Sequence, residues 1–267
     1  MFTFRDLYTP QELERVADLE KAVWTLEDRA IVPSQVMMVM IKCGGHVAGA
    51  FDGDTLVGFT MALAARKGDL WRLWSHMAGV AHTHRKRGVG FGLKQYQRHW
   101  AIQNGYDNIG WTFDPLQRVN ANFNLRRLGA VGTKYVVNAY GEMSDDLNRG
   151  LPSDRLEASW DLSSARVVDH ADGDPMPVLV ETHERHFALI VDEDGNPKRV
   201  YDDFTNAWYF VEIPFDIATV RAQSLERALA WRMALRDVLV QAFALGYYAV
   251  DFVNSDTRCW YVLYRQS

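Results

Sequence analysis

The sequence predicts a mixed α/β fold, in which helices flank a mostly antiparallel sheet and a smaller C-terminal α+β extension follows. Three observations lead to this fold class. Two strand-like runs joined by a tight turn occupy residues 46–64, and a strand, a glycine-rich turn and a helix follow at residues 70–105. A polar, turn-rich stretch at residues 149–155 then precedes the second half. We therefore predict two domains, at residues 1–162 and 163–267.

Composition excludes several classes of protein. The chain has 267 residues, of which 48% are hydrophobic, so it can bury one large or two modest cores. The net charge of −5 argues against a general nucleic-acid binder, so we expect no nucleic-acid partner. No apolar run reaches membrane-spanning length and we find no signal peptide, so we expect a cytoplasmic protein with no membrane partner.

The sequence predicts no metal site. Cys43 and Cys259, the two cysteines, form no metal-binding or redox motif. His183 and His186 stand near Glu181, but a metal site needs a further convergent ligand that the sequence does not supply.

The first 45 residues predict two helices. Thr9 and Glu12 form a capping box, so a helix is expected to run from there to Trp24. A second helix is expected to begin at its cap, Ser34, and to end at Gly44-Gly45. At least two of its methionines are expected in the core, because a methionine stripe at helical spacing usually packs there: Met37, Met38 and Met40.

Residues 46–140 supply most strands of the first half. The runs at 46–51 and 56–64 are strand-like, and Asp52-Gly53-Asp54 between them is a hairpin signal. The elements expected next, in chain order, are a strand at 70–80, a helix ending at Gly105, a strand at 108–113, a helix at about 120–128 ending at Gly129, and a strand at 134–140.

The second half predicts an α+β extension without a glycine turn of its own. Strand-like pieces at 178–191 and 198–204 flank an acidic turn, residues 192–197. This turn is similar to a calcium loop, but Pro197 stands where such a loop needs glycine, so we interpret it as a hairpin turn. The remaining expected elements are strands at 209–214, 247–253 and 260–265 and a long helix from the cap Ser224 to Gly246.

The most informative stretch is the turn at residues 85–92, Arg-Lys-Arg-Gly-Val-Gly-Phe-Gly. It joins a predicted strand to the start of a predicted helix, where unpaired backbone N–H groups and the positive end of the helix dipole converge. Glycines let the backbone approach a ligand closely, and the cationic side chains favour an anion. The turn therefore predicts a phosphate-binding site.

Two common phosphate-binding motifs do not fit this turn. No Lys-Ser or Lys-Thr pair follows the glycines, which excludes a P-loop for nucleotide triphosphates. The spacing Gly88-x-Gly90-x-Gly92 also differs from the G-x-G-x-x-G pattern of dinucleotide-binding folds.

The pattern Arg-x-x-Gly-x-Gly, which begins at Arg85, resembles the coenzyme A pyrophosphate loop of the GNAT acyltransferase superfamily. The strand at 109–113 and the helix at 120–130 resemble later motifs of that superfamily, and the resemblance covers about residues 1–145. Within it, the phrase Ser-His-Met at 75–77 looks like bacterial acetyltransferases with a long C-terminal extension. The resemblance implies a GNAT-like sheet in the first domain.

The resemblance also implies a cosubstrate, acetyl-CoA or another acyl-CoA. In the family, the strand before the turn splays from its neighbour and its backbone meets the pantetheine arm. By this analogy the N–H of Val80 polarises the thioester carbonyl. The residues expected to bind the coenzyme are Met77, Ala78, Gly79, Val80, Arg85, Lys86, Arg87, Gly88, Val89, Gly90 and Asn120.

The residue that removes the proton from the amine departs from the family pattern. Family members often place a carboxylate on the strand before the turn, and residues 71–80 contain none. His76 suits a general base, because imidazole titrates near neutral pH, and Asp114 is a second candidate. Strict alternation along the strand places His76 on one face and both Ser75 and Met77 on the other.

The residue that protonates the leaving thiolate departs from the pattern as well. Many relatives carry tyrosine four residues before the glycine of a Leu-Gly pair, where this chain has Leu125. Asn120 and Asn124 lie close by and are candidates for hydrogen bonds to the pantetheine or the sulfur. Tyr135 or Tyr140 is an alternative source of the missing hydroxyl.

Two arginines are candidates to bind a carboxylate of the acceptor or of the acyl group, because a guanidinium suits that group: Arg155 and Arg232. Arg232 falls on the apolar stripe of the long predicted helix. The alternative for it is a structural arginine paired with an acid such as Glu212 or Asp251.

A protein acetylator that acts on a lysine tail fits less well, because it would favour an open acidic groove and no long acidic run appears in the sequence. Two functional hypotheses remain. The first is an acyl-CoA-dependent N-acyltransferase that acts on the amine of a small molecule, such as an amino acid. The second is a catalytically inactive coenzyme A-binding or sensing module, which Leu125 favours. Relatives often form homodimers, and the sequence leaves the oligomeric state open.

Overall fold

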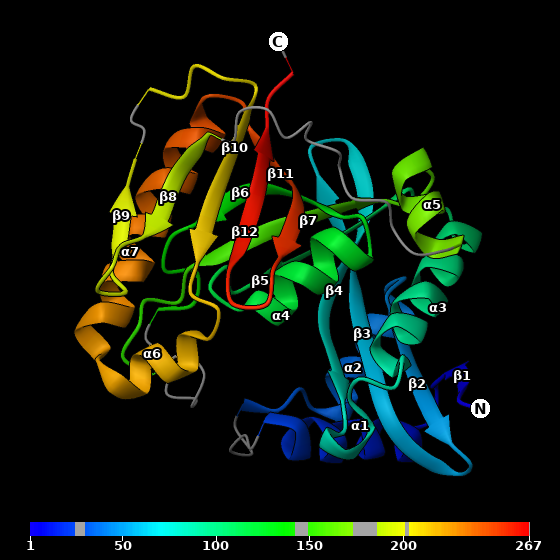
Figure 1. Ribbon diagram of the computed structural model, residues 1–267. Helices are drawn as coiled ribbons and strands as arrows, with labels where there is room; N and C mark the ends of the chain where they lie inside the picture. The colour runs from blue at the N-terminus through cyan, green and yellow to red at the C-terminus, as the bar shows by residue number, and fades with distance from the viewer. Residues whose placement is uncertain (25–29, 142–148, 173–185, 201–202, 267) are drawn as a thin grey trace. The chain divides into compact units, whose positions relative to one another are not determined.

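The computed structural model describes residues 1–24, 30–141, 149–172, 186–200 and 203–266 (Figure 1). The chain divides into two compact units. The first comprises Met1–Trp111 with Asp161–Ser163, and the second comprises Thr112–Trp160 with Ser164–Ser267. The fold is mixed α/β, with mostly antiparallel strand pairs and seven α-helices in the described part of the chain, as predicted. The predicted domain boundary near residue 163 stays a prediction.

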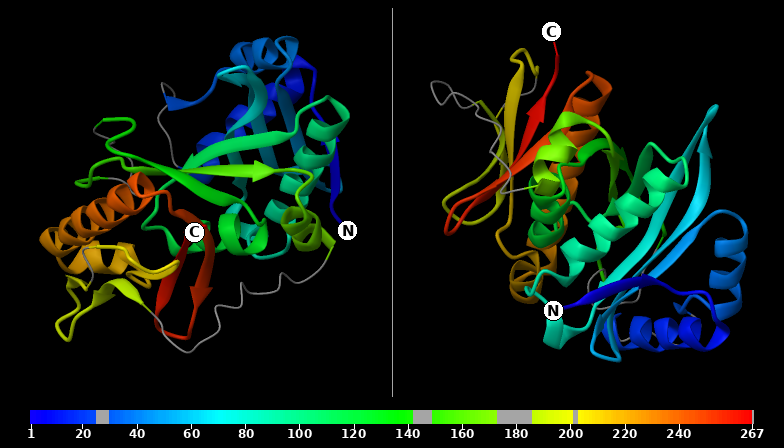
Figure 2. Two further views of the ribbon diagram at one scale, coloured as in Figure 1. Left: turned by 90° about the horizontal axis from the view of Figure 1, so that it is seen from above. Right: turned by 90° about the vertical axis from the view of Figure 1, so that its right-hand side faces the viewer.

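In the first unit, the strands follow the order β1-β2-β3-β4-β5. Their bounds are β1 Thr3–Asp6, β2 His46–Asp52, β3 Thr55–Lys67, β4 Leu70–Val80 and β5 Asn108–Phe113, of which the last two residues belong to the second unit. Neighbours from β1 to β4 are antiparallel, whereas β4 and β5 are parallel. Helices α1 (Pro10–Trp24) and α2 (Ser34–Lys42) cover one face, and α3 (Val89–Gln103) covers the other (Figure 2).

Of the two predicted helix starts in the first unit, the start of α1 is confirmed and the start of α2 differs from the prediction. The Glu12 carboxylate accepts from the Thr9 N–H at 3.1 Å, and the Glu12 N–H donates to Thr9 Oγ1 at 3.3 Å, so the capping box is confirmed. Ser34 is the first residue of α2 rather than its cap, because the N-cap is Pro33, which has no side-chain donor or acceptor. The prediction for the methionines is confirmed, since Met37 and Met40 are buried.

In the second unit, the strands follow the order β7-β6-β11-β12-β10-β8-β9. Their bounds are β6 Val131–Val136, β7 Arg155–Asp161, β8 Phe187–Val191, β9 Pro197–Arg199, β10 Trp208–Ile213, β11 Tyr248–Asn254 and β12 Cys259–Tyr264. The helices are α4 Arg118–Ala121, the π-helix Asn122–Arg127 (η3), α5 Ala165–Asp172, α6 Ile217–Gln223 and α7 Leu225–Ala244. Helix α7 lies against β6, β8, β9 and β10, whereas η3 lies against β11.

Several predictions in the second unit are confirmed by local contacts. Ser224 caps α7, because its hydroxyl accepts from the Arg227 N–H at 3.1 Å. The acidic turn forms the β8–β9 hairpin, in which Asp192 Oδ1 accepts from the Asn196 N–H at 2.7 Å. The first part of the predicted strand at 178–191 lies outside the described residues. No helix in the described ranges is both long and apolar enough to span a bilayer.

Candidate functional site

The predicted phosphate-binding turn lies between β4 and α3 and leaves space for a ligand. The backbone has positive φ at Lys86 (60°) and at Gly88 (82°), and Gly88 is the N-cap of α3. A Cβ built on Gly88 would meet no atom within 4 Å, so the backbone is open there. The first N–H groups of a helix have no partner inside the helix, and they face this end. These features fit an anionic group such as a pyrophosphate.

The third glycine of the turn has a packing role. A Cβ built on Gly92 would lie 2.2 Å from Cζ of Phe4, a residue of β1. Gly92 therefore lets α3 approach the ring of Phe4, and it does not widen the ligand space as the sequence suggests.

The cationic side chains around the turn differ in their contacts with other protein groups. Arg87 Nη1 and His84 Nε2 both contact Asp52 Oδ2, at 3.8 and 3.3 Å. Arg85 and Lys86 are exposed to solvent. Arg85 Nε also donates to the Val80 carbonyl at 3.3 Å, and the exposed side chains of the turn are all candidates to reach a bound phosphate.

Strands β4 and β5 separate beside the turn. They pair at Leu73↔Ile109 and Trp74↔Gly110, and among the described residues the pairing goes no further toward the turn. On the other side, β3 pairs with β4 as far as Val80. The four strand residues predicted to bind the coenzyme, 77–80, therefore have an open edge on the β5 side, where backbone groups are available to a ligand.

A β-bulge interrupts β4 and corrects the predicted alternation. The register with β3 pairs Met61 with Met77 and Ala62 with Ser75, so His76 is the extra residue. Ser75 faces α3, whereas Met77 packs against the core cluster that α1 and α2 build. The prediction that Ser75 and Met77 share a face is wrong, because strict alternation does not allow for the inserted residue.

Side chains from α3 and β3 hold both flanks of this bulge. Lys94 Nζ donates to Ser75 Oγ at 3.2 Å and to Gln97 Oε1 at 2.6 Å. Gln97 Nε2 donates to Thr60 Oγ1 at 2.9 Å, and Thr60 Oγ1 donates to the Met77 carbonyl at 3.4 Å. The chain of hydrogen bonds fixes the backbone on either side of His76.

Lys94 is a residue that our sequence analysis missed. It is buried, its Nζ lies 4.2 Å from the centre of the Trp111 ring, and burial lowers its pKa to about 7. A signal was present in the sequence, because Lys94 shares the buried face of α3 with Gln97 and Ala101, at helical spacing.

His76 itself is exposed on the bulge. Nearby protein nevertheless desolvates the imidazole and lowers its pKa below the ordinary 6.5. The ring is therefore largely neutral at pH 7 and able to accept a proton. Its role as the general base stays a prediction.

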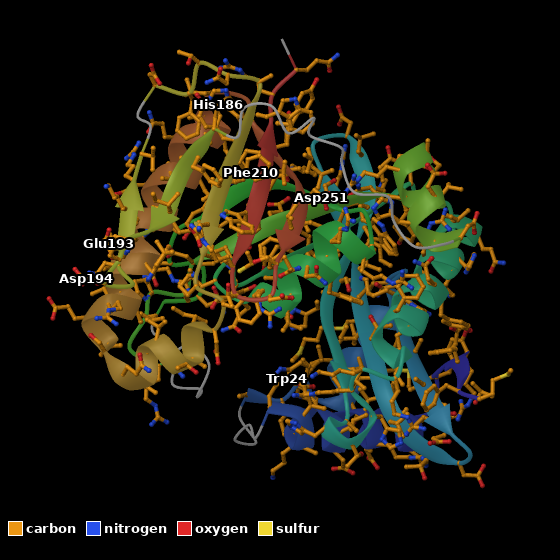
Figure 3. All side chains as sticks on the ribbon, in the orientation of Figure 1. Trp24, His186, Glu193, Asp194, Phe210 and Asp251 are labelled. Atoms are coloured by element: carbon orange, nitrogen blue, oxygen red, sulfur yellow. The ribbon has the colours of Figure 1, made fainter. Side chains whose placement is uncertain are left out.

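Gly79, on the same strand, is covered by an aromatic side chain of α1. A Cβ on Gly79 would lie 3.0 Å from Trp24 Cη2 and 2.9 Å from a Phe59 ring carbon. Trp24 lies at the C-terminal end of α1 and packs edge-on against Phe59, with ring centres 5.9 Å apart (Figure 3). Glycine at position 79 therefore makes room for these rings on the α1 face.

Two predicted site residues of the second unit pair with each other. Arg232 Nη2 lies 2.8 Å from Asp114 Oδ1, and the exposed fractions of the two side chains are 1% and 11%. The acids that the sequence analysis offered as partners, Glu212 and Asp251, pair instead with other arginines (Figure 3 shows Asp251 on β11). Nε and Nη1 of Arg232 have no partner within the described residues.

The remaining polar candidates of the second unit are held by Asp154 or exposed near it. Arg155 Nη1 donates to the Asp154 carbonyl at 2.9 Å. The Tyr135 hydroxyl donates to Asp154 Oδ2 at 2.8 Å, and burial raises its pKa. Tyr140 is exposed, with its hydroxyl 3.2 Å from Thr112 Oγ1. Of the two tyrosines, Tyr140 is the one whose hydroxyl is accessible to a ligand.

The predicted helix after β5 is split between two helix types. Asn120 is exposed on α4, whereas Asn124 and Leu125 are buried in the π-helix η3. The backbone carbonyl of Asn124 accepts from the Ala130 N–H at 3.0 Å. Leu125, at the usual tyrosine position, is fully buried and offers no hydroxyl.

Residues 3–130 match the family model described as the Acetyltransferase (GNAT) family. Residues 3–130 are a GNAT acetyltransferase domain. The turn, the open edge of β4 and the bulge all lie inside the GNAT region, as do Asp114, Asn120 and Asn124. Arg155 and Arg232 lie beyond it. No curated protein sequence matches the chain.

Solved structures are similar to part of the chain, and each match covers nearly all of the other chain. The ribosomal-protein-S18-alanine N-acetyltransferase from Escherichia coli is 11% identical with a TM-score of 0.49, and the match covers 62% of this chain and 96% of that one. An N-acetyltransferase from Staphylococcus aureus Mu50 is 14% identical with a TM-score of 0.48, covering 61% and 99%. A chain of the NatC complex, solved with Gag peptide and CoA, is 14% identical with a TM-score of 0.48, covering 60% and 98%.

Metal-binding side chains do not gather in the described ranges, where no group of three or more His, Cys, Asp or Glu residues is placed to hold an ion. His183 and Glu181, which the sequence analysis considered, lie outside those ranges.

Proposed function

We propose that the chain is an acyl-CoA-dependent N-acyltransferase that acts on the amine of a small molecule. The observation that carries the proposal is the open turn at Gly88, at the start of α3, beside the free edge of β4 in a GNAT domain. A turn of this kind accommodates a pyrophosphate, and an open strand edge suits the amides of a pantetheine arm. An acyl-CoA supplies the activated acyl group as a thioester.

The chain's own residues divide the work between binding and proton transfer. The backbone N–H groups of Val89 and Gly90, with the side chains of Arg85 and Lys86, hold the negative charge. Backbone groups of residues 77–80 orient the arm, as the family resemblance implies. His76 Nδ1 or Nε2 takes a proton from the acceptor ammonium, because its lowered pKa leaves the ring neutral.

Asp114 is less suited to the base role. Its carboxylate is already engaged by the buried Arg232, whose Nη2 lies 2.8 Å from Asp114 Oδ1. Of the two tyrosines that the sequence analysis offered, Tyr140 is the exposed one and is our candidate to protonate the thiolate.

The second candidate is a coenzyme A-binding module without transferase activity. The buried Leu125 favours it, because the family's usual hydroxyl is absent from that position. This candidate predicts coenzyme binding with no acyl transfer to any amine, so a thiol-release assay over an amine panel separates the two.

The test of coenzyme binding is a thermal-shift series with CoA, acetyl-CoA and succinyl-CoA. At 100 times its dissociation constant a ligand stabilises the protein by roughly 2.7 kcal/mol. We expect Gly88→Trp to abolish the shift, because the indole fills the open turn. Gly68→Trp is the matched control, since Gly68 also has positive φ (61°) and an open Cβ position but lies in the β3–β4 turn. A wild-type shift in Gly88→Trp would overturn the assignment of the turn.

A further inference from the structure

Lys94 joins three elements of the first unit at the place where β4 and β5 separate. It stands on the buried face of α3 and is 4% exposed. Its Nζ lies 3.2 Å from Ser75 Oγ on β4 and 4.2 Å from the centre of the Trp111 ring on β5. Trp111 directly follows Gly110, which pairs with Trp74 of β4. The lysine therefore reaches both strands beside the open edge of β4.

The amine of Lys94 is a hydrogen-bond donor in either protonation state. Burial lowers its pKa to about 7. The ammonium and the neutral amine both carry at least two N–H bonds, which is enough for Ser75 Oγ and Gln97 Oε1. An apolar side chain of similar length, such as methionine, would fill the same space without the cost of burying a polar group. The two hydrogen bonds are therefore what distinguishes lysine at this position.

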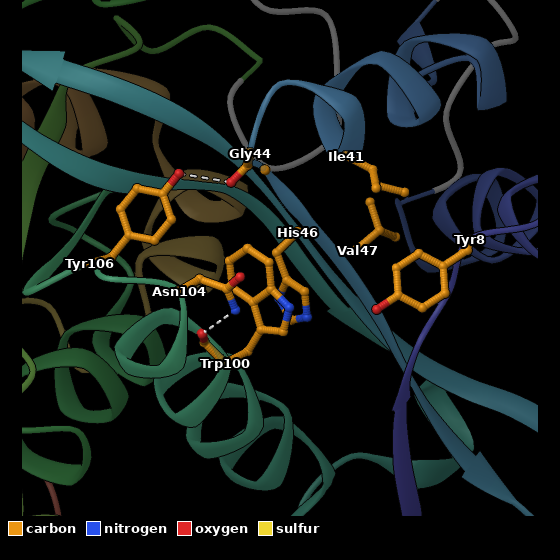
Figure 4. A pocket seen from close by; sticks show the side chains of 9 residues that line it. Tyr8, Ile41, Gly44, His46, Val47, Trp100, Asn104 and Tyr106 are labelled. Carbon is orange, nitrogen blue, oxygen red and sulfur yellow. Dashed lines mark hydrogen bonds between the residues drawn. The ribbon is translucent and has the colours of Figure 1, made fainter.

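A cavity of about 320 Å³ in the first unit does not account for this buried lysine. The cavity lies where α2 ends, β2 begins and α3 ends (Figure 4). It is lined by Trp100 and Asn104 from the end of α3, and neither Lys94 nor Ser75 is among the described residues of its lining. The hydrogen bonds of Lys94 lead to the bulge in β4 instead.

Two hydrogen-bonded paths from Lys94 end on opposite sides of His76. One path goes directly to Ser75 Oγ. The other passes through two further buried side chains, one on α3 and one on β3, to the Met77 carbonyl. The register with β3 includes both of these neighbours and skips His76. A bulge aims the side chain of its inserted residue, so the groups that hold its two flanks also set the direction of the His76 imidazole.

We propose that Lys94 is a positioning residue for acyl transfer, which holds both flanks of the bulge and thereby aims the His76 imidazole at the acceptor amine. The inference rests on the proposed function, in which His76 takes the proton. A general base must lie within hydrogen-bond reach of that proton, so a displaced backbone at residues 75–77 takes the ring out of reach. Burial is what lowers the pKa of His76, so Lys94 acts through the position of the ring.

Two matched variants separate positioning from stability. Lys94→Met and Arg98→Met each remove a buried cation from α3, and Arg98 stands one turn later on the same helix. The Arg98 guanidinium donates to the Leu162 carbonyl at 2.6 and 3.0 Å, and that carbonyl is not part of the bulge. Both variants should be less stable than the wild type, and only Lys94→Met should release the bulge. Ser75→Ala removes the acceptor on β4 and replaces Lys94→Met in every measurement if that variant does not fold.

The backbone order parameter of His76, from nitrogen relaxation of the ligand-free chain, measures the bulge without any reaction. We expect the rigid value of about 0.85 in the wild type and in Arg98→Met, and a fall toward about 0.6 in Lys94→Met. A wild-type order parameter in Lys94→Met would overturn the proposal.

Steady-state kinetics give the second measurement. A displacement of about 1 Å in a catalytic group can lower a rate roughly 100-fold, so we expect Lys94→Met to lower kcat by about 10- to 100-fold. The KM for the acyl-CoA should change by less than about threefold, since the coenzyme turn is unaltered, and Arg98→Met should keep the wild-type kcat. The kcat losses of Lys94→Met and Ser75→Ala should not add in the double variant, because both break the same hydrogen bond. Additive losses would overturn the proposal.

Failure of the proposed function and failure of this inference give different results. A wild-type chain that transfers no acyl group to any amine would overturn the proposed function, and the order parameter would still decide whether Lys94 holds the bulge. Transfer by the wild type together with an unchanged kcat in Lys94→Met would overturn the role of Lys94 and leave the proposed function standing.

Discussion

Replacing Glu20 with glutamine measures the cost of a buried carboxylate on α1. The Glu20 side chain is fully buried, and its oxygens accept from the Val32 N–H at 3.2 and 3.3 Å. Burial outweighs this hydrogen bond and raises the pKa of Glu20 from 4.5 to about 7. Because the folded pKa exceeds the unfolded one, this group's stabilising contribution is complete below pH 4.5 and is lost as the pH rises through 7.

The magnitude follows from the two pKa values. The difference between 4.5 and about 7 corresponds to roughly 3 kcal/mol of unfolding free energy, at about 1.4 kcal/mol for each tenfold change in proton affinity. Glu20→Gln keeps an oxygen for the Val32 N–H and cannot ionise. We therefore expect it to match the wild type near pH 4 and to be roughly 3 kcal/mol more stable near pH 8.

Urea unfolding of both proteins across this pH range is the assay. Glu14→Gln, an exposed position on the same helix, is the control and should change stability little at any pH. A stability difference between Glu20→Gln and the wild type that stays constant with pH would refute the reasoning, because the difference must follow the titration of one carboxylate.

Three other substitutions test the packing and chemistry of the site. Gly92→Ala should lower the free energy of unfolding by about 1–3 kcal/mol, since the added Cβ would lie 2.2 Å from Phe4. Adding Phe4→Ala should relieve that clash. If the two substitutions instead lower the denaturant midpoint additively, the clash is not the cause. Arg232→Met should lower the free energy of unfolding by about 3–5 kcal/mol, because it leaves Asp114 without its cation. The double variant Asp114→Asn/Arg232→Met should recover part of that loss. Unchanged stability with weakened acceptor affinity would instead show that Arg232 binds the acceptor. His76→Ala should lower kcat and spare coenzyme affinity, and the acid limb of the wild-type kcat/KM profile should lie below pH 6.5; a limb above that value would remove His76 from the mechanism.

The sequence predicted well the features that depend on interactions between neighbouring residues in the chain. The capping box of Thr9 and Glu12, the cap at Ser224 and the glycine turn each depend on a few adjacent residues, and each forms where expected. The strand at 155–161 was missed although its sequence signals it, because Leu156, Ala158 and Trp160 alternate with polar residues at the spacing of a strand.

The rest of the site depends on partners far apart in the chain. The bulge at His76 exists only in the register with β3, which no spacing within β4 reveals. The partner of Arg232 was missed because Asp114 is distant in sequence. Lys94 was open to prediction, since a lysine on the buried face of a helix calls for a polar partner on the sheet beneath it.

The bulge also shows that the pairing of β3 with β4 does not require the residue at position 76. Ser75 and Met77 face opposite sides of β4, as two adjacent residues of a regular strand would. Removing position 76 would therefore leave an unbroken strand with both neighbours still on their present faces. His76 is therefore an inserted residue that does not take part in the register between β3 and β4. Its side chain is accordingly free to change with the reaction that the chain performs, while the strand that displays it stays the same.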